Sequence, residues 1–164
     1  MFKAFYKSPI GPLEIISDST AILEVNFVRS DREVPEPGKY VTDVIRQCIK
    51  ELEEYFAGTR KKFDVPYKLE GTDFQVRVWK ELEKIEYGAT VTYSEQAKKL
   101  GDIKAIRAVG TANGKNRLAI IVPCHRVKGN DGSLVGYAGG IDKKKWLLLH
   151  EQEHSDGAVR QSLF

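Results

Sequence analysis

The sequence predicts an α/β protein of the α+β type, in which a small sheet with one helix comes first and a helical part follows. Its 164 residues suffice for one domain or two small ones, and a hydrophobic content of 41% supplies an ordinary core. Strand-like alternation opens the chain, whereas helical spacing of apolar residues dominates after residue 71. This change of pattern divides the chain into residues 1–70 and 71–164.

The first part is expected to form three strands and one helix. The strands are expected at residues 2–8, 11–17 and 21–28. After the proline-rich loop "VPEPG", apolar residues recur on one stripe and predict a helix from Lys39 to Phe56 that ends at Gly58. Cys48 lies on this stripe, so we interpret it as a small core hydrophobe.

The second part begins with a series of helices. Thr72 can serve as the N-cap of the first. Thr92, with a glutamate three residues later, has capping-box spacing and starts a short helix that stops at Gly101. Asp102 can cap a further helix that ends at Gly114. Two helices joined by such a tight turn predict a helix-turn-helix motif.

Positive charge gathers in the same region. The chain has a net charge of +3, but residues 1–71 carry 11 Lys and Arg against 12 Asp and Glu, whereas residues 72–164 carry 15 against 11. Asp102 is the one acid in a run with eight basic residues, which are Lys98, Lys99, Lys104, Arg107, Lys115, Arg117, Arg126 and Lys128. Such a run usually forms a solvated face, but this one contains a candidate nucleophile, Cys124, which favours an anionic partner.

The second helix of the motif has an unusual composition. Ala105, Ala108 and Ala112 recur at helical spacing, Gly110 lies nearby, and Arg107 is the long side chain in the middle. Small residues in this pattern fit close packing against another helix. They also fit a flat face that enters the minor groove of DNA, with Arg107 as the inserted side chain. The sequence leaves both interpretations open.

The sequence "VPCHRV" at residues 122–127 holds the main candidate for chemistry. The apolar "LAIIV" that leads into it is expected to be a buried strand. Positive charge from His125 and Arg126 is expected to lower the pKa of the Cys124 thiol and favour the nucleophilic thiolate. Neighbours in an extended segment point to opposite sides, so His125 is expected to reach the thiol through a water or a local twist. Glu151 is the candidate acid that fixes the imidazole.

The last helix, "KKKWLLLHEQEH", is expected to be capped by Asp142. It ends in "HEQEH", which matches the H-E-x-x-H pattern of zinc hydrolases with His150 and His154 as ligands. The pattern is short, and a catalytic zinc needs a third protein ligand, for which Asp156 is the sole candidate after it. We therefore interpret the two histidines as a helix-end pair. A zinc hydrolase and a cysteine-dependent hydrolase are the alternatives.

Five motifs, in their order and spacing, make the chain resemble the O6-alkylguanine-DNA alkyltransferases: "TYSEQA", "RAVGTAN" followed by Asn116, "IVPCHRV", "GYAGG" and "KKKWLLLHE". The resemblance covers essentially the whole second half. It implies an RNase H-like domain at residues 1–70 and a winged helix-turn-helix DNA-binding domain at residues 71–164. It also implies DNA repair by direct removal of alkyl groups from O6-alkylguanine in duplex DNA, after the nucleotide is flipped out.

The resemblance assigns catalytic roles residue by residue. Cys124 would be the alkyl acceptor, His125 its base through a water, and Glu151 the acid that orients His125. Asn116 would be a hinge between the recognition helix and the active-site loop. Arg107 would take the place of the flipped base in the stack. The thioether product cannot be hydrolysed by these groups, so the protein is expected to react once.

The resemblance also assigns residues to the DNA and to the base. Tyr93 would contact the extruded nucleotide and its 3′ phosphate. The other expected DNA contacts are Lys104, Ala105, Ala108, Gly110, Thr111 and Arg126. The residues expected to line the alkylguanine pocket are Val127, Tyr137, Ala138, Gly139 and Lys144. Some relatives carry a serine where this chain has Ala138, so there only the backbone N–H is expected to reach guanine O6.

The expected partner is duplex DNA that contains O6-alkylguanine, bound by a monomer. No cofactor is expected, and no metal, because the first half has no histidine and only one cysteine, Cys48. No apolar run approaches the roughly 20 residues of a membrane span, and no signal peptide is visible, so a cytoplasmic, nucleoid-associated or nuclear protein is expected. A damage sensor that does not repair is a rival function, and Cys124 argues against it.

Overall fold

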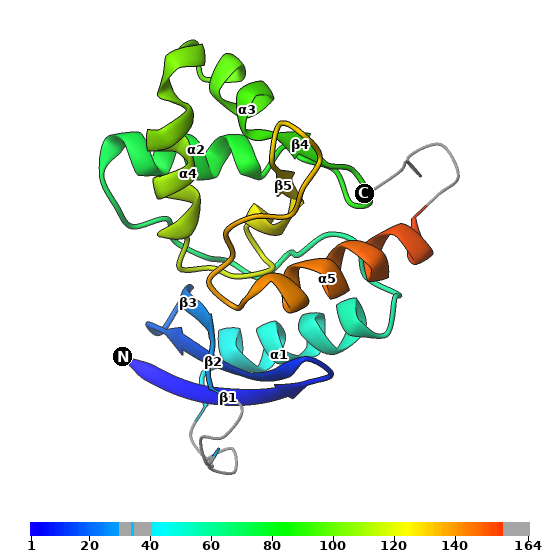
Figure 1. Ribbon diagram of the computed structural model, residues 1–164. Helices are drawn as coiled ribbons and strands as arrows, with labels where there is room; N and C mark the ends of the chain where they lie inside the picture. Colours follow the sequence, from blue (N-terminus) through cyan, green and yellow to red (C-terminus); the bar gives the residue numbers. More distant parts are fainter. Residues whose placement is uncertain (30–33, 35–40, 156–164) are drawn as a thin grey trace. The chain divides into compact units, whose positions relative to one another are not determined.

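A computed structural model of the chain describes residues 1–29, 34 and 41–155 (Figure 1). The chain divides into two compact units. The first unit comprises Met1–Glu70 and Arg117–Ile121, and the second unit comprises the rest. A single cut after residue 70 therefore misses one short segment, Arg117–Ile121, which precedes Cys124 in the sequence but belongs with the first unit.

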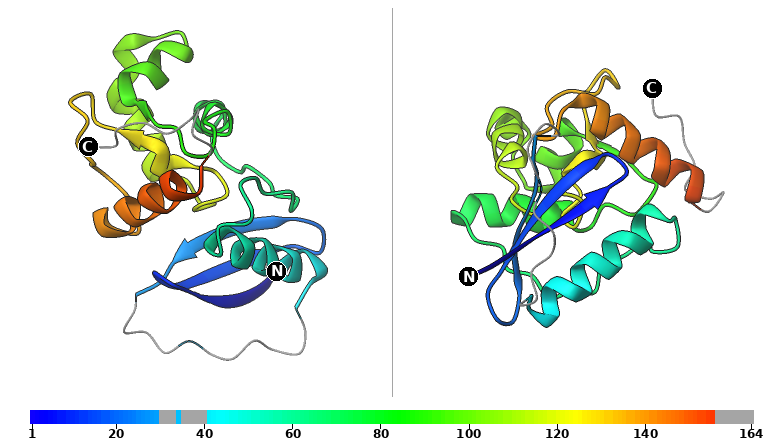
Figure 2. Two further views of the ribbon diagram at one scale, coloured as in Figure 1. Left: turned by 90° about the vertical axis from the view of Figure 1, so that its right-hand side faces the viewer. Right: turned by 90° about the horizontal axis from the view of Figure 1, so that it is seen from below.

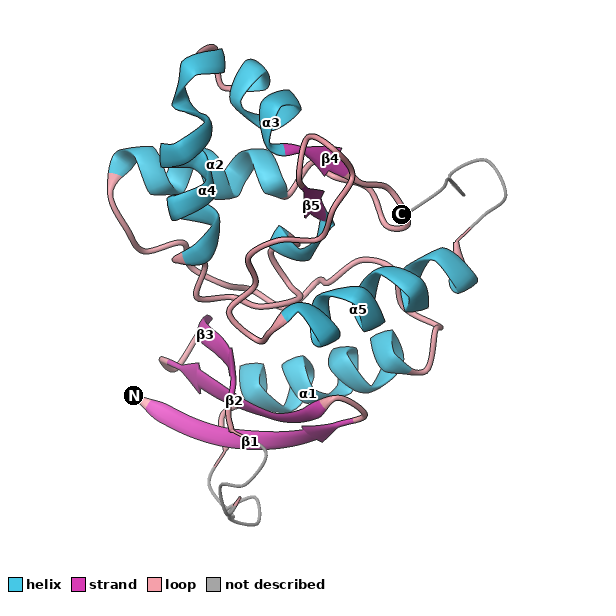
Figure 3. Cartoon of the chain, viewed as in Figure 1, coloured by secondary structure: helices cyan, strands magenta, loops and turns pink. Residues whose placement is uncertain are grey.

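The first unit is built on an antiparallel sheet of three strands, drawn in magenta in Figure 3. In spatial order these are β1 (Phe2–Ser8), β2 (Gly11–Ser17) and β3 (Ile22–Phe27). The bounds confirm the three predicted strands closely. Gly11 opens β2 with a φ of 111°, a conformation that a residue with a Cβ rarely adopts, and this allows the tight turn after β1.

Helix α1 (Asp43–Phe56) packs against the sheet of the same unit (Figures 1 and 2). The Thr42 hydroxyl caps it by accepting a hydrogen bond from a first-turn N–H at 3.2 Å. The predicted start at Lys39 lies outside the described residues. Cys48 is fully buried on the apolar stripe, as predicted. The helix ends just before Gly58, which takes a positive φ of 81°.

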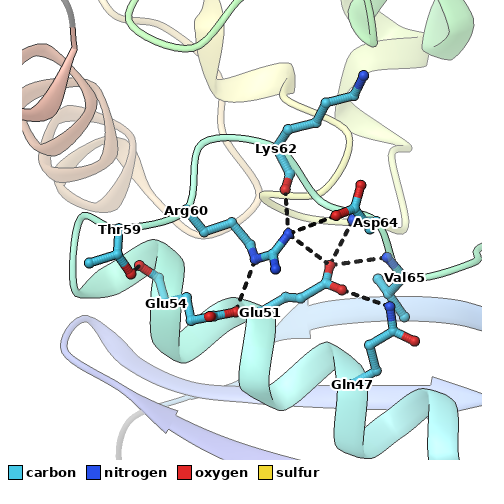
Figure 4. Close-up of polar contacts among 8 residues, drawn as sticks. All are labelled: Gln47, Glu51, Glu54, Thr59, Arg60, Lys62, Asp64 and Val65. Atoms are coloured by element: carbon cyan, nitrogen blue, oxygen red, sulfur yellow. Dashed lines mark hydrogen bonds and ion pairs between the residues drawn. The ribbon is translucent and has the colours of Figure 1, made fainter.

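A network of polar contacts ties the loop after α1 back to that helix (Figure 4). Glu51 is 2% exposed, and its carboxylate accepts hydrogen bonds from the backbone N–H groups of Asp64 at 2.8 Å and Val65 at 3.0 Å. Arg60 lies 4.0 Å from the same carboxylate and 3.1 Å from that of Glu54. A buried carboxylate is costly unless it is hydrogen-bonded, so these contacts stabilise both the charge and the loop.

The segment Arg117–Ile121 also belongs to the first unit, but it is not the predicted strand. Only one isolated bridge forms, between Leu118 and Val25 of β3. The chain then turns, with Ile120 at a φ of 71° and the Ile121 N–H bonded to the carbonyl of residue 119 at 2.8 Å. The prediction of a buried strand at "LAIIV" is wrong because its apolar side chains are buried in a turn, and burial alone does not distinguish the two.

The second unit is mainly helical. Its elements are α2 (Asp73–Leu82), β4 (Val91–Thr92), α3 (Tyr93–Lys99), α4 (Ile106–Gly114), β5 (Val127–Lys128) and α5 (Ile141–His154). Strands β4 and β5 pair in parallel. Thr72 caps α2 and Thr92 caps α3, both as predicted. In the case of Thr72 the cap is a full capping box with Gln75.

Helices α3 and α4 form the predicted helix-turn-helix motif (Figure 1). Gly101 turns the chain with a φ of 89°. Asp102 then caps a 3-10 turn at Ile103–Ala105, from which α4 continues. The buried side chains of Gln96 and Asn113 lock the two helices together through reciprocal amide hydrogen bonds of 2.9 and 2.8 Å. These buried hydrogen bonds fix the alignment of α3 and α4 within the otherwise apolar core of the motif.

The small residues of α4 lie on two different faces of the helix, one buried and one exposed. Ala112 is buried, and its carbonyl accepts a hydrogen bond from the indole N–H of Trp79 in α2 at 2.9 Å. Ala108 lies on the exposed face beside the exposed Arg107. Of the two interpretations left open, close helix packing holds at Ala112, while the exposed face remains available to a ligand.

Helix α5 begins differently from its prediction. Its N-cap is Gly140, at a φ of 100°, which has no side chain to form a capping bond. Asp142 lies inside the first turn, so its assignment as the cap is wrong, although its negative charge suits the helix dipole there. In the parts of the chain that the structure describes, no helix is both long and apolar enough to cross a membrane.

Candidate active site

Cys124 lies at the start of a 3-10 turn, Cys124–Arg126, in the second unit. The Nδ2 of Asn116 donates hydrogen bonds to the Cys124 Sγ at 3.2 Å and to the carbonyl of Val122 at 2.9 Å. One amide thus connects the segment that follows α4 with the segment before the cysteine and with the thiol itself. The extended geometry expected for the "PCHR" sequence is wrong, because the 3-10 turn replaces it.

Burial raises the pKa of the Cys124 thiol above its ordinary value, while the Asn116 hydrogen bond and the charge of Lys144 act to lower it. The expectation that His125 and Arg126 lower this pKa is therefore wrong. His125 is kept neutral, and the charge of Arg126 is used elsewhere. The side chains that favour the thiolate come from Asn116, in the segment after α4, and from Lys144 in α5, not from His125 and Arg126.

His125 is fully buried, and its Nε2 lies 2.6 Å from the Oε2 of Glu151 in α5. Burial lowers the pKa of His125, against the opposing effect of Glu151, and the charges of Arg126 and Lys144 lower it further. A neutral imidazole that faces a carboxylate carries its proton on that nitrogen, so Nε2–H donates to Glu151. The Nδ1 has no hydrogen-bond partner among the described residues and is left as an acceptor.

Arg126 binds the other side of the same carboxylate. Its Nε donates to Glu151 Oε1 at 2.7 Å, its Nη2 donates to Oε2 at 3.2 Å, and its Nη1 donates to the carbonyl of Ile85 at 2.6 Å. Burial alone would raise the pKa of Glu151, but the contacts with His125 and Arg126 hold it well below its ordinary value. Glu151 is thus ionised and paired.

The assignment of Arg126 to the DNA-contacting residues needs correction. Its side chain is 8% exposed, and its guanidinium lies over the ring of Tyr87 at 5.7 Å. The sequence carried a usable signal: an arginine next to a buried histidine must find a carboxylate, and Glu151 was already expected beside that histidine. Charge patterning alone had placed Arg126 with the exposed basic residues.

Lys144 and Tyr93 meet at one carbonyl of the loop before α5. The Lys144 Nζ donates to the carbonyls of Val135 at 2.9 Å and Gly136 at 3.4 Å, and the Tyr93 hydroxyl donates to Val135 at 3.3 Å. The same loop brings the Tyr137 ring edge-on to the His125 ring, with 6.5 Å between centroids. Burial lowers the pKa of Lys144 to about 8, and Cys124 opposes this shift.

The remaining residues expected to line the substrate pocket occupy two places. Val127 is buried in β5 and pairs with Val91. Ala138 and Gly139 lie in the turn between Tyr137 and α5, within the same loop that Lys144 and Tyr93 hold. All of these residues belong to the second unit, as Cys124 does.

The residues expected to contact DNA, Arg126 excepted, lie on the helix-turn-helix motif. Lys104, Arg107, Ala108 and Thr111 are exposed, whereas Ala105 and Gly110 are half-buried. A Cβ added at Gly110 would lie 3.8 Å from the Tyr93 ring, an ordinary van der Waals distance, so a small side chain would also fit there. The exposed members present two cations and two short side chains along the 3-10 turn and α4, which suits approach to a phosphate backbone.

The "HEQEH" sequence does not form a zinc site within the described residues. Its glutamate, Glu151, is bound to His125 and Arg126. The His154 Nδ1 bonds to the carbonyl of His150 at 2.7 Å, and the His150 ring stacks on Trp146. The described part of the chain contains no group of three or more side chains that could hold a metal, and Asp156 lies outside it.

Comparison with protein families gives two matches, one before and one after residue 70. Residues 1–69 match the model described as 6-O-methylguanine DNA methyltransferase, ribonuclease-like domain. Residues 73–153 match the model described as 6-O-methylguanine DNA methyltransferase, DNA binding domain. The fold class is therefore α+β, with a ribonuclease-like domain that carries the three-stranded sheet, followed by a helical DNA-binding domain.

Individual relatives are similar over nearly the full chain. A methylated-DNA–protein-cysteine methyltransferase of Methanosarcina acetivorans is 47% identical, covering 92% of this chain and 98% of the relative. The protein of the same name from Mycobacterium tuberculosis is 44% identical, with 96% and 94% covered.

Solved structures of such relatives have a similar fold over nearly the full chain. A crystal structure of the Mycobacterium tuberculosis O6-methylguanine methyltransferase has a TM-score of 0.83 at 42% identity, with 94% of each chain covered. A structure of the Mycobacterium tuberculosis protein in complex with DNA has a TM-score of 0.84 at 41% identity, with 96% and 97% covered.

Proposed function

The chain belongs to the 6-O-methylguanine DNA methyltransferase family, and from that premise we propose that Cys124 is the residue that accepts the methyl group. The activity is DNA repair by methyl transfer from O6-methylguanine to a cysteine of the protein. The chain has one other cysteine, Cys48, which is fully buried and whose pKa burial raises to about 12. Cys124 is partly exposed and carries a hydrogen bond to its sulfur.

The chemistry is a direct displacement. The Cys124 thiolate attacks the methyl carbon, the new S–C bond forms as the C–O6 bond breaks, and the electron pair of that bond leaves with the guanine. The base then takes up one proton and is left as ordinary guanine. A soft, strong nucleophile suits an alkyl carbon, and the thioether formed has no ready route back to a thiol. Each molecule therefore reacts once.

His125 and Glu151 prepare the thiol. The unpaired Nδ1 of His125 is the acceptor for the thiol proton, reached through a water, and Glu151 stabilises the imidazolium that results. Arg126 binds both oxygens of Glu151 and holds the carboxylate in the orientation that His125 needs. Asn116 holds the sulfur and the preceding carbonyl in one geometry.

Duplex DNA binds through the helix-turn-helix motif. The structure of the Mycobacterium tuberculosis relative with DNA supports a DNA partner. The exposed Lys104, Arg107, Ala108 and Thr111 lie on one surface of the motif, with Arg107 as the side chain that fills the space of a flipped nucleotide. The flipped base binds beside the loop that carries Tyr137, Ala138 and Gly139. Contacts of this kind follow the backbone and show little base preference.

The Asn116–Cys124 contact beside the paired His125 and Glu151 is the observation that carries this proposal. It is tested by incubating the protein with one equivalent of a duplex that contains O6-methylguanine. The intact mass should rise by one methyl group in place of one hydrogen, and the peptide that contains Cys124 should carry it. Cys124→Ser should show no gain while it still binds the duplex. A methyl group on Cys48 in the wild-type protein would refute the assignment.

A further inference from the structure

The last turn of α4 leads into the residue that holds the nucleophile. Asn116 follows the helix, which ends at Gly114, and its side-chain amide donates to the Cys124 Sγ at 3.2 Å and to the Val122 carbonyl at 2.9 Å. A hydrogen bond weakens steeply with poor geometry, so this contact is only as well placed as the backbone that carries Asn116. Whatever fixes that backbone therefore also fixes the surroundings of the sulfur.

Trp79 of α2 binds this last turn. Its side chain is buried, and its indole Nε1–H donates to the Ala112 carbonyl at 2.9 Å. The same carbonyl accepts from the Lys115 N–H at 3.1 Å, and since a carbonyl oxygen has two lone pairs, these two donors satisfy it. The Asn116 N–H binds the carbonyl of Asn113 at 3.2 Å. Both backbone bonds span three residues, as in a 3-10 helix, and they tighten the chain just before Asn116.

Gln96 of α3 binds the next residue of the same turn. Its buried side chain and that of Asn113 exchange two amide hydrogen bonds, of 2.9 and 2.8 Å. Ala112 and Asn113 are consecutive, so two neighbouring residues at the end of α4 are held by two different helices. Buried hydrogen bonds of this kind impose a defined geometry, because breaking either one would leave a polar group without a partner.

The place of the indole is itself defined by a glycine. A Cβ added at Gly71, which precedes α2, would lie 2.7 and 2.8 Å from two atoms of the Trp79 ring. It would also lie 2.6 Å from the side-chain oxygen of Gln75, which forms the capping box with Thr72. These distances are too short for real contacts, so a side chain here would force the indole or the cap to move. Gly71 thus leaves room for Trp79 in the orientation that reaches Ala112.

We propose that Trp79 is a positioning residue of the methyl-transfer site, which binds the Ala112 carbonyl and thereby sets the end of α4 so that the Asn116 amide meets the Cys124 sulfur. The proposal rests on the assignment of Cys124 as the methyl acceptor. Trp79 acts through Asn116, which is the residue in contact with the sulfur. Helix α4 then has two tasks, because its exposed face carries Arg107 and its last turn places the group that holds the nucleophile.

The test measures the ionisation of the thiol without DNA. The rate of Cys124 alkylation by iodoacetamide is followed against pH, with the labelled residue identified by peptide mass. An N–H that donates to the sulfur favours the thiolate, so Asn116→Ala should raise the midpoint by about one pH unit. Trp79→Phe keeps an aromatic ring but removes the indole N–H, and it should raise the midpoint by about half a unit because the Asn116 contact loosens. The rate of methyl transfer from a duplex at neutral pH should fall about threefold with the thiolate fraction.

A double variant distinguishes positioning from a general loss of structure. If Trp79 acts through Asn116, Trp79→Phe should add nothing to the midpoint once residue 116 is alanine. Trp146→Phe makes the same change on α5, where the ring stacks on His150, and it should leave the midpoint at its wild-type value. The titratable groups that influence Cys124 stay the same in all of these variants, and they are Tyr93, Tyr137 and Lys144.

An unchanged midpoint in Trp79→Phe overturns the proposal, and so does an equal shift with and without the Asn116 amide. If Trp79→Phe does not fold, Gly71→Ala asks the same question from an exposed position, because its methyl group presses on the indole. Its midpoint should rise, whereas that of Gly114→Ala, whose added Cβ meets nothing within 4 Å, should not. An unaltered midpoint in Gly71→Ala also overturns the proposal. Iodoacetamide labelling does not depend on which residue accepts the methyl group, which Cys124→Ser decides separately.

Discussion

The two cysteines of the chain lie in different units and show how surroundings determine the reactivity of a thiol. Cys48 is fully buried in α1, and burial together with the nearby Glu51 raises its pKa to about 12. Burial also raises the pKa of Cys124, but there the Asn116 hydrogen bond and the charge of Lys144 act in the opposite direction. The residue type is the same, and the neighbouring charges differ in sign.

The buried glutamate of each unit extends the comparison. Glu51 accepts from two backbone N–H groups and lies near Arg60, so it stabilises a loop. Glu151 is just as buried, but it accepts from His125 and Arg126. A carboxylate satisfied by backbone groups stabilises the fold, whereas one satisfied by an imidazole can change the properties of that imidazole.

Replacing the two glutamates one at a time should separate these roles. Glu151→Gln should lower the rate of methyl transfer by about 100-fold, because the charge that makes His125 an effective base is gone. It should also reduce stability, since Arg126 loses its carboxylate. Glu51→Gln should cost about 2 kcal/mol of unfolding free energy through poorly matched hydrogen bonds. Single-turnover rates and urea unfolding measure both effects.

The matched pair contains its own control, because both variants make the same chemical change at a buried site. Rates are compared per folded molecule, so a loss of stability does not imitate a loss of chemistry. Equal losses of rate in Glu151→Gln and Glu51→Gln would break the distinction between the two carboxylates. A normal rate in Glu151→Gln would remove His125 and Glu151 from the mechanism.

A smaller effect is expected at Arg107. Arg107→Ala should lower the transfer rate from a duplex by about tenfold, because flipping the nucleotide costs a few kcal/mol and needs a side chain to fill the gap. The rate with free O6-methylguanine base should stay close to that of the wild type, since nothing is flipped. Equal losses on both substrates would mean that Arg107 supports the fold of the site instead. Lys115→Ala, another exposed cation near the end of α4, is the control for charge alone.

Local signals predicted the elements well. The three strands, the caps at Thr72 and Thr92 and the turn at Gly101 all depend on residues close in sequence. The position of Cys48 on the α1 stripe followed from helical spacing. These features rest on short-range geometry and could be read from residue types and intervals.

The failures have a common physical cause, which is contact over long sequence separation. Apolar composition at "LAIIV" correctly predicted burial but could not show that the segment forms one bridge to Val25 and then turns. The charge of Arg126 suggested DNA, yet its partners Glu151 and Ile85 lie 25 and 41 residues away. For the same reason, the opposing effects of burial and charge on the Cys124 pKa could not be weighed from its immediate neighbours.

The contrast between the two cysteines is tested most directly by counting methyl groups at each of them. The wild-type protein is mixed with a large excess of duplex that contains O6-methylguanine, and the methyl groups on each cysteine are counted by peptide mass as the reaction runs to completion. We predict one methyl group per protein molecule, all of it on Cys124, with Cys48 unmodified. Methyl transfer that continues beyond one equivalent, or that appears on Cys48, would contradict the account.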